Sequence, residues 1–247
     1  MTRTDAVVDY LKSRKSLPLT MMSVPGPSAS ELRDMLEIAA RSPDHGRLEP
    51  WRFIVYRDEA GREIGEKLAK RAEEINGPMA DDQLNRERNR LRRAPVAIGV
   101  VSAIKESASI PEWEQFLSAG AVAMNLVHAA NAFGFHANWV TGWYSDDEKG
   151  RAILGLSPEE RMAGIVHIGS CDREIAERPR PDIDSLISDY SGEYISHSAF
   201  GHTWVSCITN TYHLIIIFSI TYKRARSFKN TNCFKFSLQL PYRFKSI

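Results

Sequence analysis

The sequence predicts one mixed α/β domain of the α+β class, followed by a tail of different composition. A β-branched run at 95–104 is typical of a buried strand, and an Ala-rich helical period covers 111–133. All 31 acidic residues precede residue 196, whereas seven of the 32 basic residues follow it. A chain of 247 residues can hold one sizeable domain, or at most two small ones. We therefore expect a domain over 1–193 and an acid-free extension over 194–247.

The N-terminal part of this domain should contain two helices and a strand. A helical period of apolar residues covers 4–15, and a Pro/Ser-rich connector follows it. Ser30 is the expected N-cap of a second amphipathic helix, which Pro43 should end. The segment WRFIVYR, 51–57, has the composition of a strand.

The rest of the domain alternates helices and strands. Two highly charged segments predict helices with one solvated face, and the buried strand, the long Ala-rich helix and two further strands follow them. The expected elements are helices at 59–75 and 80–93, a strand at 95–104, a helix at 111–133, a strand and turn at 136–144, a short helix at 146–154 and a strand at 162–170.

Composition excludes several classes of protein. A formal net charge of +1 favours neither nucleic acid nor an anionic membrane as a partner, and 43% apolar residues are typical of a soluble globular protein. The cysteines, Cys171, Cys207 and Cys233, form no CxxC pair and are odd in number, which favours a reducing compartment. The N-terminus lacks the apolar core of a secretory leader, so we expect a cytoplasmic protein.

The extension has the composition of a sequence that was not selected for folding. It is rich in Ser, Thr, Phe, Lys and Ile, and its apolar peak at 214–220 is too short to span a bilayer. One hypothesis is that it arises from a frameshift or read-through, and the alternative is a genuine but poorly ordered tail.

Motifs for several common chemistries are missing. The sequence has no dinucleotide-binding glycine fingerprint, no Walker lysine loop, no nucleophile elbow and no HExxH motif. The seven histidines are scattered, so no metal site is predicted, and His128 and His167 lie in apolar stretches where a core role is expected.

Three polar patches lie at the ends of expected elements. SRKS at 13–16 ends the first helix and suits a phosphate, although cations there also complement the helix dipole. ARSPDHGRLEPWRFIVY at 40–56 runs into the first strand, and its Arg47 and Arg52 are expected to be solvated. NWVTG at 138–142 ends a strand with a glycine, which would let backbone amides approach a planar ligand, or is an ordinary strand-to-turn junction.

Together the three patches resemble the nitroreductase superfamily of flavin enzymes, in the short branch that carries a Pro-Asp-His motif. The shared pattern is an RxS cluster closing the first helix, R-[SA]-P-D-H-x-x-x-[EQ]-P-W-x-F after it, a W-x-[ST]-G turn after the long helix and I-x-I-G on the last strand. The resemblance spans about residues 5–183 of this chain. It implies a mainly antiparallel sheet flanked by helices, and a homodimer with FMN at the interface.

The resemblance also implies a site. Arg14, Lys15 and Ser16 would grip the FMN phosphate and ribityl chain, with Lys15 standing where most relatives have Arg. Arg41 and His45 would reach FMN across the interface from the partner subunit. The cofactor ring would be lined by Trp139, Val140 and Thr141, with Val140 where relatives often have Arg. Two softer expectations are an NAD(P)H contact at 129–134 and a phosphate contact from Arg178 or Arg180.

The implied activity is that of an FMN-dependent NAD(P)H oxidoreductase acting on nitroaromatic, quinone-like or related electrophiles. NADH or NADPH would deliver hydride to flavin N5, and a small-molecule acceptor would then take two electrons in a ping-pong scheme. The flavin carries this chemistry, so no catalytic side chain and no metal is expected. The alternatives are a flavin-binding module without turnover and a specialised member such as a flavin-dependent dehalogenase.

Overall fold

The computed structural model describes residues 2–190, and those up to Arg180 form one compact unit. A four-stranded sheet runs through it in the order β1-β2-β4-β3, and all three pairings are antiparallel. The strands are β1 (Trp51–Tyr56), β2 (Val96–Ser102), β3 (His136–Val140) and β4 (Arg161–Gly169). The predicted α+β class, the antiparallel sheet and the four strands are confirmed.

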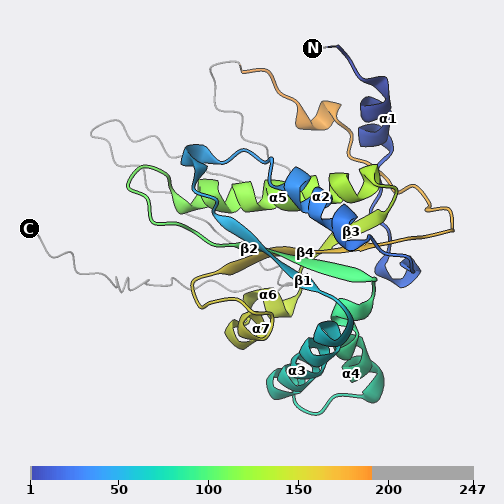
Figure 1. Ribbon diagram of the computed structural model, residues 1–247, viewed down its shortest axis with the longest axis vertical. Coiled ribbons are helices and arrows are strands. Elements are labelled where there is room, and N and C mark those ends of the chain that lie inside the picture. Colours follow the sequence, from blue (N-terminus) through green and yellow to red (C-terminus); the bar gives the residue numbers. More distant parts are fainter. Residues whose placement is uncertain (1, 191–247) are drawn as a thin grey trace, which may run out of the picture. The chain divides into compact units, whose positions relative to one another are not determined.

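One face of the sheet carries α2 (Ala29–Ala39) and α5 (Glu112–Ala132), as Figure 1 shows. The helix α5 packs directly on β2, β3 and β4, and α2 packs on α5. Small side chains such as Ala119, Ala123 and Ala130 are fully buried along α5, so helix and sheet approach closely. The predicted Ala-rich packing face is therefore confirmed.

The other face carries four helices: α3 (Asp58–Asn76), α4 (Asp81–Arg88), α6 (Trp143–Asp146) and α7 (Glu148–Ile153). A second apolar cluster fills the space between these helices and the sheet, around Tyr56, Leu68 and Ile165. Because the sheet is covered on both sides, every residue of β2 is buried, as its uninterrupted apolar run predicted.

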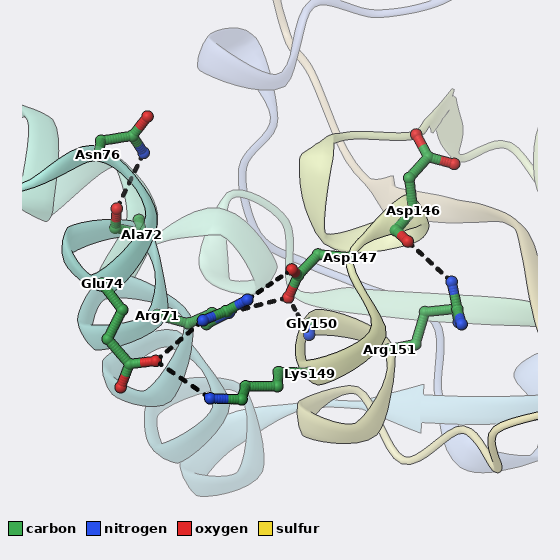
Figure 2. A network of polar contacts seen from close by, with 9 residues as sticks. All are labelled: Arg71, Ala72, Glu74, Asn76, Asp146, Asp147, Lys149, Gly150 and Arg151. Carbon is green, nitrogen blue, oxygen red and sulfur yellow. Dashed lines mark hydrogen bonds and ion pairs between the residues drawn. The ribbon is translucent and has the colours of Figure 1, made fainter.

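A polar network joins α7 to α3 at the edge of this second layer (Figure 2). Asp147 caps α7 by accepting a hydrogen bond from the Gly150 amide at 2.7 Å. The same carboxylate accepts two hydrogen bonds from the Arg71 guanidinium of α3, at 3.0 and 2.7 Å. The guanidinium lowers the pKa of Asp147 to about 2, so this carboxylate is ionised at neutral pH.

The expected cap of α2 was wrong by two residues. Ser28, not Ser30, accepts the Glu31 amide, and the Glu31 carboxylate accepts the Ser28 amide at 2.8 Å. This capping box needs an acid three residues after the serine, a spacing that Ser28 has and Ser30 lacks. Ser30 lies in the first turn of the helix.

The remaining N-terminal elements are α1 (Asp5–Ser13) and a 3-10 turn at Leu19–Met21. Within residues 2–190 no helix combines the length and apolarity that crossing a membrane requires. Residues 181–190 contain a 3-10 turn at Asp184–Leu186. The predicted extension over 194–247 lies outside the described residues.

Candidate functional site

The cluster that closes α1 lies beside β3. The Leu17 amide donates to the Ala137 carbonyl at 3.4 Å, and the Asn138 side chain donates to the Leu17 carbonyl at 2.7 Å. Leu17 is fully buried, so it anchors the segment to the strand. The first and third sequence patches are therefore neighbours: Arg14, Lys15 and Ser16 precede this anchor, and Trp139, Val140 and Thr141 continue the strand that it contacts.

The two cations of the α1 cluster differ in availability. Lys15 donates to the Ile175 carbonyl at 2.9 Å, and its ammonium lies 3.5 Å from the Glu177 carboxylate. In contrast, no carboxylate within the described residues pairs with the half-buried Arg14. Within the described part of the chain, Arg14 is therefore the cation of this cluster that is free to meet an anion, and a negative ligand would compete with Glu177 for Lys15.

The segment after β4 returns to the same cluster. Arg180 donates to the Arg14 carbonyl at 3.2 Å and to the Glu177 carboxylate at 2.9 Å. This places the Arg180 guanidinium beside the α1 cluster. The exposed Arg178 has a hydrogen bond only through its backbone amide within residues 2–190.

The end of β3 presents three different environments. Trp139 is 37% exposed, and its indole N–H donates to the Ala163 carbonyl of β4 at 3.2 Å. Val140 is half-buried and Thr141 is exposed. Packing within the protein explains why a glycine stands at Gly142, because a Cβ there would lie 2.6 Å from the Tyr144 ring. The glycine is thus needed for packing against that ring, whereas the sequence had suggested room for a ligand.

The second patch forms a tightly bonded loop between α2 and β1. The Pro43 carbonyl accepts a hydrogen bond from Ser118 of α5 at 2.7 Å. The Asp44 carboxylate accepts the amides of Leu48 and Glu49 at 3.1 and 2.8 Å, which closes the turn. His45 lies at the tip of this loop, and its Nδ1 lies 2.8 Å from the Glu114 carboxylate of α5. Arg41 is exposed where α2 ends, and no carboxylate within 2–190 pairs with it.

The tip of this loop lies far from the α1 cluster within one subunit, although its first residues contact α5 nearer to His128, where the Asn125 side chain donates to the Ser42 hydroxyl at 2.9 Å. The imidazole of His128, on α5, is 2.8 Å from the Tyr10 hydroxyl of α1, whereas Glu114 near the start of α5 contacts His45. At 1.5 Å per residue, the fourteen residues between these two contact points span about 21 Å along the helix axis. The fold therefore brings together two of the three predicted patches, and the tip of the remaining patch, with His45, stands apart.

A cavity of about 310 Å³ opens beside the His45 loop. Its apolar walls come largely from the start of α5 and the segment before it, through Ile110, Trp113 and Leu117. Sequence reasoning missed these residues. The sequence carried part of the signal, because Trp113 and Leu117 are four residues apart and so lie on one helix face. Their exposure, 63% for each, is decided by the tertiary structure.

A second, more polar cavity of about 470 Å³ lies elsewhere in the compact unit, where α5, α6, α7 and β4 meet. Its lining includes Phe116, Asp146, Arg151 and Arg161. None of the eight predicted site residues lines this cavity.

Both expected core histidines are confirmed as such. His167 is buried in β4, and burial lowers its pKa to about 4, so it is neutral at physiological pH. His128 is half-buried against Tyr10, and burial lowers its pKa as well. Within residues 2–190, no group of three or more histidine, cysteine or acidic side chains is placed to hold a metal ion.

One sequence expectation was wrong. Arg52, expected to be solvated, grips the Glu160 carboxylate with hydrogen bonds of 2.6 and 2.7 Å and also donates to the Gly155 carbonyl. In the segment 129–134, where an NAD(P)H contact was expected, Ala129 and Ala130 are buried in the core, so such a contact would fall to residues 131–134 and stays a prediction. The charge and the small size of these residues were visible in the sequence, but their neighbours were not.

The chain belongs to the nitroreductase family. The family model for the "Nitroreductase family" matches residues 22–170, which include the His45 loop and the end of β3.

Similar proteins agree with this assignment. A "Putative NAD(P)H nitroreductase" from Haemophilus influenzae is 37% identical over 70% of this chain and 91% of its own length. Among solved structures, a nitroreductase-like family protein from Bacillus cereus has a TM-score of 0.63 at 22% identity, over 78% of this chain and all of its own. A nitroreductase with bound FMN from Bacteroides fragilis has a TM-score of 0.58 at 20% identity, over 76% of this chain and all of its own. These structures share the fold.

Proposed function

We propose that this protein is an FMN-dependent oxidoreductase that takes electrons from NADH or NADPH and reduces nitroaromatic, quinone-like or related electrophiles. The observation that carries the proposal is the junction of the α1 cluster with the end of β3, through Leu17 and Ala137, in a chain of the nitroreductase family. This junction connects the segment of Arg14, a cation without a carboxylate partner among residues 2–190, to the strand that carries Trp139, whose indole N–H is hydrogen-bonded.

The residues present fit FMN by the chemistry of their donors. Arg14 offers a guanidinium fork for a phosphate, Lys15 a second cation and Ser16 a hydroxyl. Trp139, Val140 and Thr141 offer an aromatic, an apolar and a hydroxyl side chain for a planar ring with polar edges. When bound, FMN supplies the hydride and two-electron chemistry, so the protein contributes binding, orientation and electrostatics.

The proposal includes a homodimer with two shared sites. His45 lies too far from Arg14 for one subunit to bring them together, but a two-fold axis would place His45, with Arg41 of the same patch, near the α1 cluster of the partner. The outer surface of α5 suits such an axis, since Trp113, Phe116 and Leu117 are exposed along it. Exposed apolar side chains that gather on one helix favour a protein interface. We also place the protein in the cytoplasm, as its cysteine usage suggests.

Anaerobic titration of the purified full chain tests this function. The protein is reconstituted with FMN, and NADPH or NADH is added while the visible flavin absorption is followed. Bleaching by a nicotinamide and recovery on adding a nitroaromatic or a quinone are the expected results. A chain that cannot be loaded with FMN would refute the proposal. A bound flavin that neither nicotinamide reduces would instead identify a binding module without turnover.

A further inference from the structure

The Trp139 indole lies between two glycines on different elements. A Cβ on Gly164 of β4 would lie 1.8 Å from the indole Nε1, a separation that no side chain can occupy. A Cβ on Gly120 of α5 would lie 3.9 Å from the far edge of the same ring, at ordinary contact distance. The indole therefore sits directly against the backbone of β4 with its other edge toward α5.

An irregularity in the sheet creates this seat. Along the β2–β4 pairing, Val100 is opposite Gly164 and Val101 is opposite Met162, so Ala163 has no partner on β2. This is a β-bulge, which redirects local backbone groups. The Ala163 carbonyl accepts the indole N–H at 3.2 Å, and Gly164 has a φ of +155°, a region that favours glycine.

We propose that the bulge formed by Ala163 and Gly164 is a positioning element that holds Trp139 as a fixed wall of the flavin site. This inference rests on the proposed function. The bulge fixes the ring through one hydrogen bond and one close backbone contact, and 37% of the residue stays exposed. A ring held in one orientation before the ligand arrives loses little conformational freedom on binding, so the bulge contributes to affinity without touching the cofactor.

The test is Gly164→Ala in the full chain. The added methyl group displaces the indole, so we expect the Kd for FMN to rise about tenfold or more. A second readout uses protein without flavin and measures how strongly iodide quenches the fluorescence of Trp139. The Trp139 signal is obtained by subtracting the spectrum of the matching protein that carries Trp139→Phe. We expect this quenching to increase when the ring leaves its seat.

Two matched variants separate displacement from other effects. Gly120→Ala adds a methyl group at ordinary distance from the same ring. Gly77→Ala introduces backbone strain at a φ of +77° with no atom within 4 Å of its Cβ. Both should leave the FMN Kd and the Trp139 quenching at wild-type values, although Gly77→Ala lowers the melting temperature.

A double-mutant cycle then distinguishes positioning from general stability. In a Trp139→Ala background there is no ring to displace, so adding Gly164→Ala should not weaken FMN binding further, although backbone strain still lowers the melting temperature. Fully additive effects on the FMN Kd would overturn the proposal. So would Gly164→Ala with wild-type quenching and wild-type FMN affinity.

Trp139→Phe decides the matter if Gly164→Ala does not fold. This variant keeps an aromatic ring but loses the donor to Ala163, and a several-fold rise in the FMN Kd is expected; an unchanged Kd would count against the bulge. Failure of the wild-type chain to bind FMN would refute the proposed function and the flavin role of the bulge together. Quenching in the flavin-free protein would then still show whether the bulge fixes the indole.

Discussion

At the scale of single residues, charge alone does not distinguish binding residues from structural ones. Arg14 and Arg41 have no carboxylate partner within residues 2–190, whereas Arg52 is fully engaged by Glu160 and Gly155. All three cations lie at the end or the start of an expected element in the sequence. Only their surroundings in the fold distinguish the two cations available for binding from the structural one.

Arg14→Ala and Arg41→Ala should each weaken FMN binding more than Arg57→Ala. The first two remove cations assigned to the cofactor, and a hydrogen bond to a charged group contributes about 1.5–3 kcal/mol. Arg57 is exposed at the N-terminus of α3, so its loss should matter little. Flavin retained after gel filtration measures the effect, and equal occupancy in the three variants would contradict the site assignment.

Arg52→Ala should destabilise the protein by about 1–3 kcal/mol, because it leaves a buried carboxylate without its charged partner. The Glu160 side chain is only 9% exposed, whereas that of Arg52 is 40% exposed, so the loss is smaller than for a fully buried pair. Urea unfolding measures it. Arg62→Ala removes an exposed pair with Glu59 and is the control, with a much smaller expected change because solvent screens that pair.

The same pair makes stability depend on pH. Hydrogen bonds from Arg52 hold the pKa of Glu160 at about 2, below its ordinary value of 4.5. Because the folded pKa is the lower one, this contribution to stability is complete above pH 4.5 and is lost as pH falls toward 2. Unfolding followed from neutral pH downward should show a steeper loss in wild type than in Arg52→Ala. If stability fell with pH equally steeply in wild type and Arg52→Ala, the Arg52–Glu160 pair would not be the source of the pH dependence.

The sequence predicted individual site segments correctly where a local pattern of polar residues marks the end of a helix or strand. The segments around Arg14, His45 and Trp139 could be found as polar patches at element ends. The role of each of these segments depends on a partner far along the chain. Lys15 pairs with Glu177, 162 residues away, and His45 contacts Glu114, 69 residues away. Trp139 is hydrogen-bonded to Ala163, which is 24 residues away on another strand. No local spacing encodes such contacts.

At the scale of elements, helix starts depend on the spacing of two side chains. Ser28 and Glu31 form the capping box of α2, and the helix carries Leu32, Met35 and Ala39 into the core. Every predicted strand and helix is present, since each follows from a period of apolar residues that is readable locally. The misplaced cap shows that element ends depend on reciprocal bonds that a single serine does not reveal.

Ser28→Ala should destabilise the protein by about 1 kcal/mol, because it leaves a backbone N–H of the first turn of α2 without its partner. Ser30→Ala is the matched control, because that serine makes no bond to the backbone amides of the first turn. Thermal unfolding of the two variants measures the difference. A larger loss from Ser30→Ala would restore Ser30 as the cap.

At the scale of the whole molecule, the predicted site needs two copies of the chain. Leu117→Glu places a charge in the middle of the exposed apolar face of α5, so we expect a monomer that no longer retains FMN. Ile75→Glu, on α3, changes a 48% exposed apolar residue elsewhere and should leave the assembly intact. Analytical ultracentrifugation with flavin absorbance measures both properties. A dimeric, flavin-loaded Leu117→Glu protein would exclude this face as the interface.

The extension over 194–247 remains a prediction from composition. If it comes from a frameshift or read-through, intact-mass measurement on the protein from its native source should give a product shorter than 247 residues. A full-length mass would instead support a genuine tail.

The sequence by itself determined the α+β class, the four strands, the order of the helices and the family resemblance, because apolar periods and short motifs are local properties of the chain. Only the tertiary structure decided that Arg52 is a structural residue, that Gly142 serves Tyr144 and that a bulge seats Trp139. It also decided that His45 and Tyr10, on the helix that the α1 cluster closes, contact opposite parts of α5. The physical reason is that burial, pairing and separation in space arise between residues far apart in the chain, which acquire neighbours only when the sheet and helices pack.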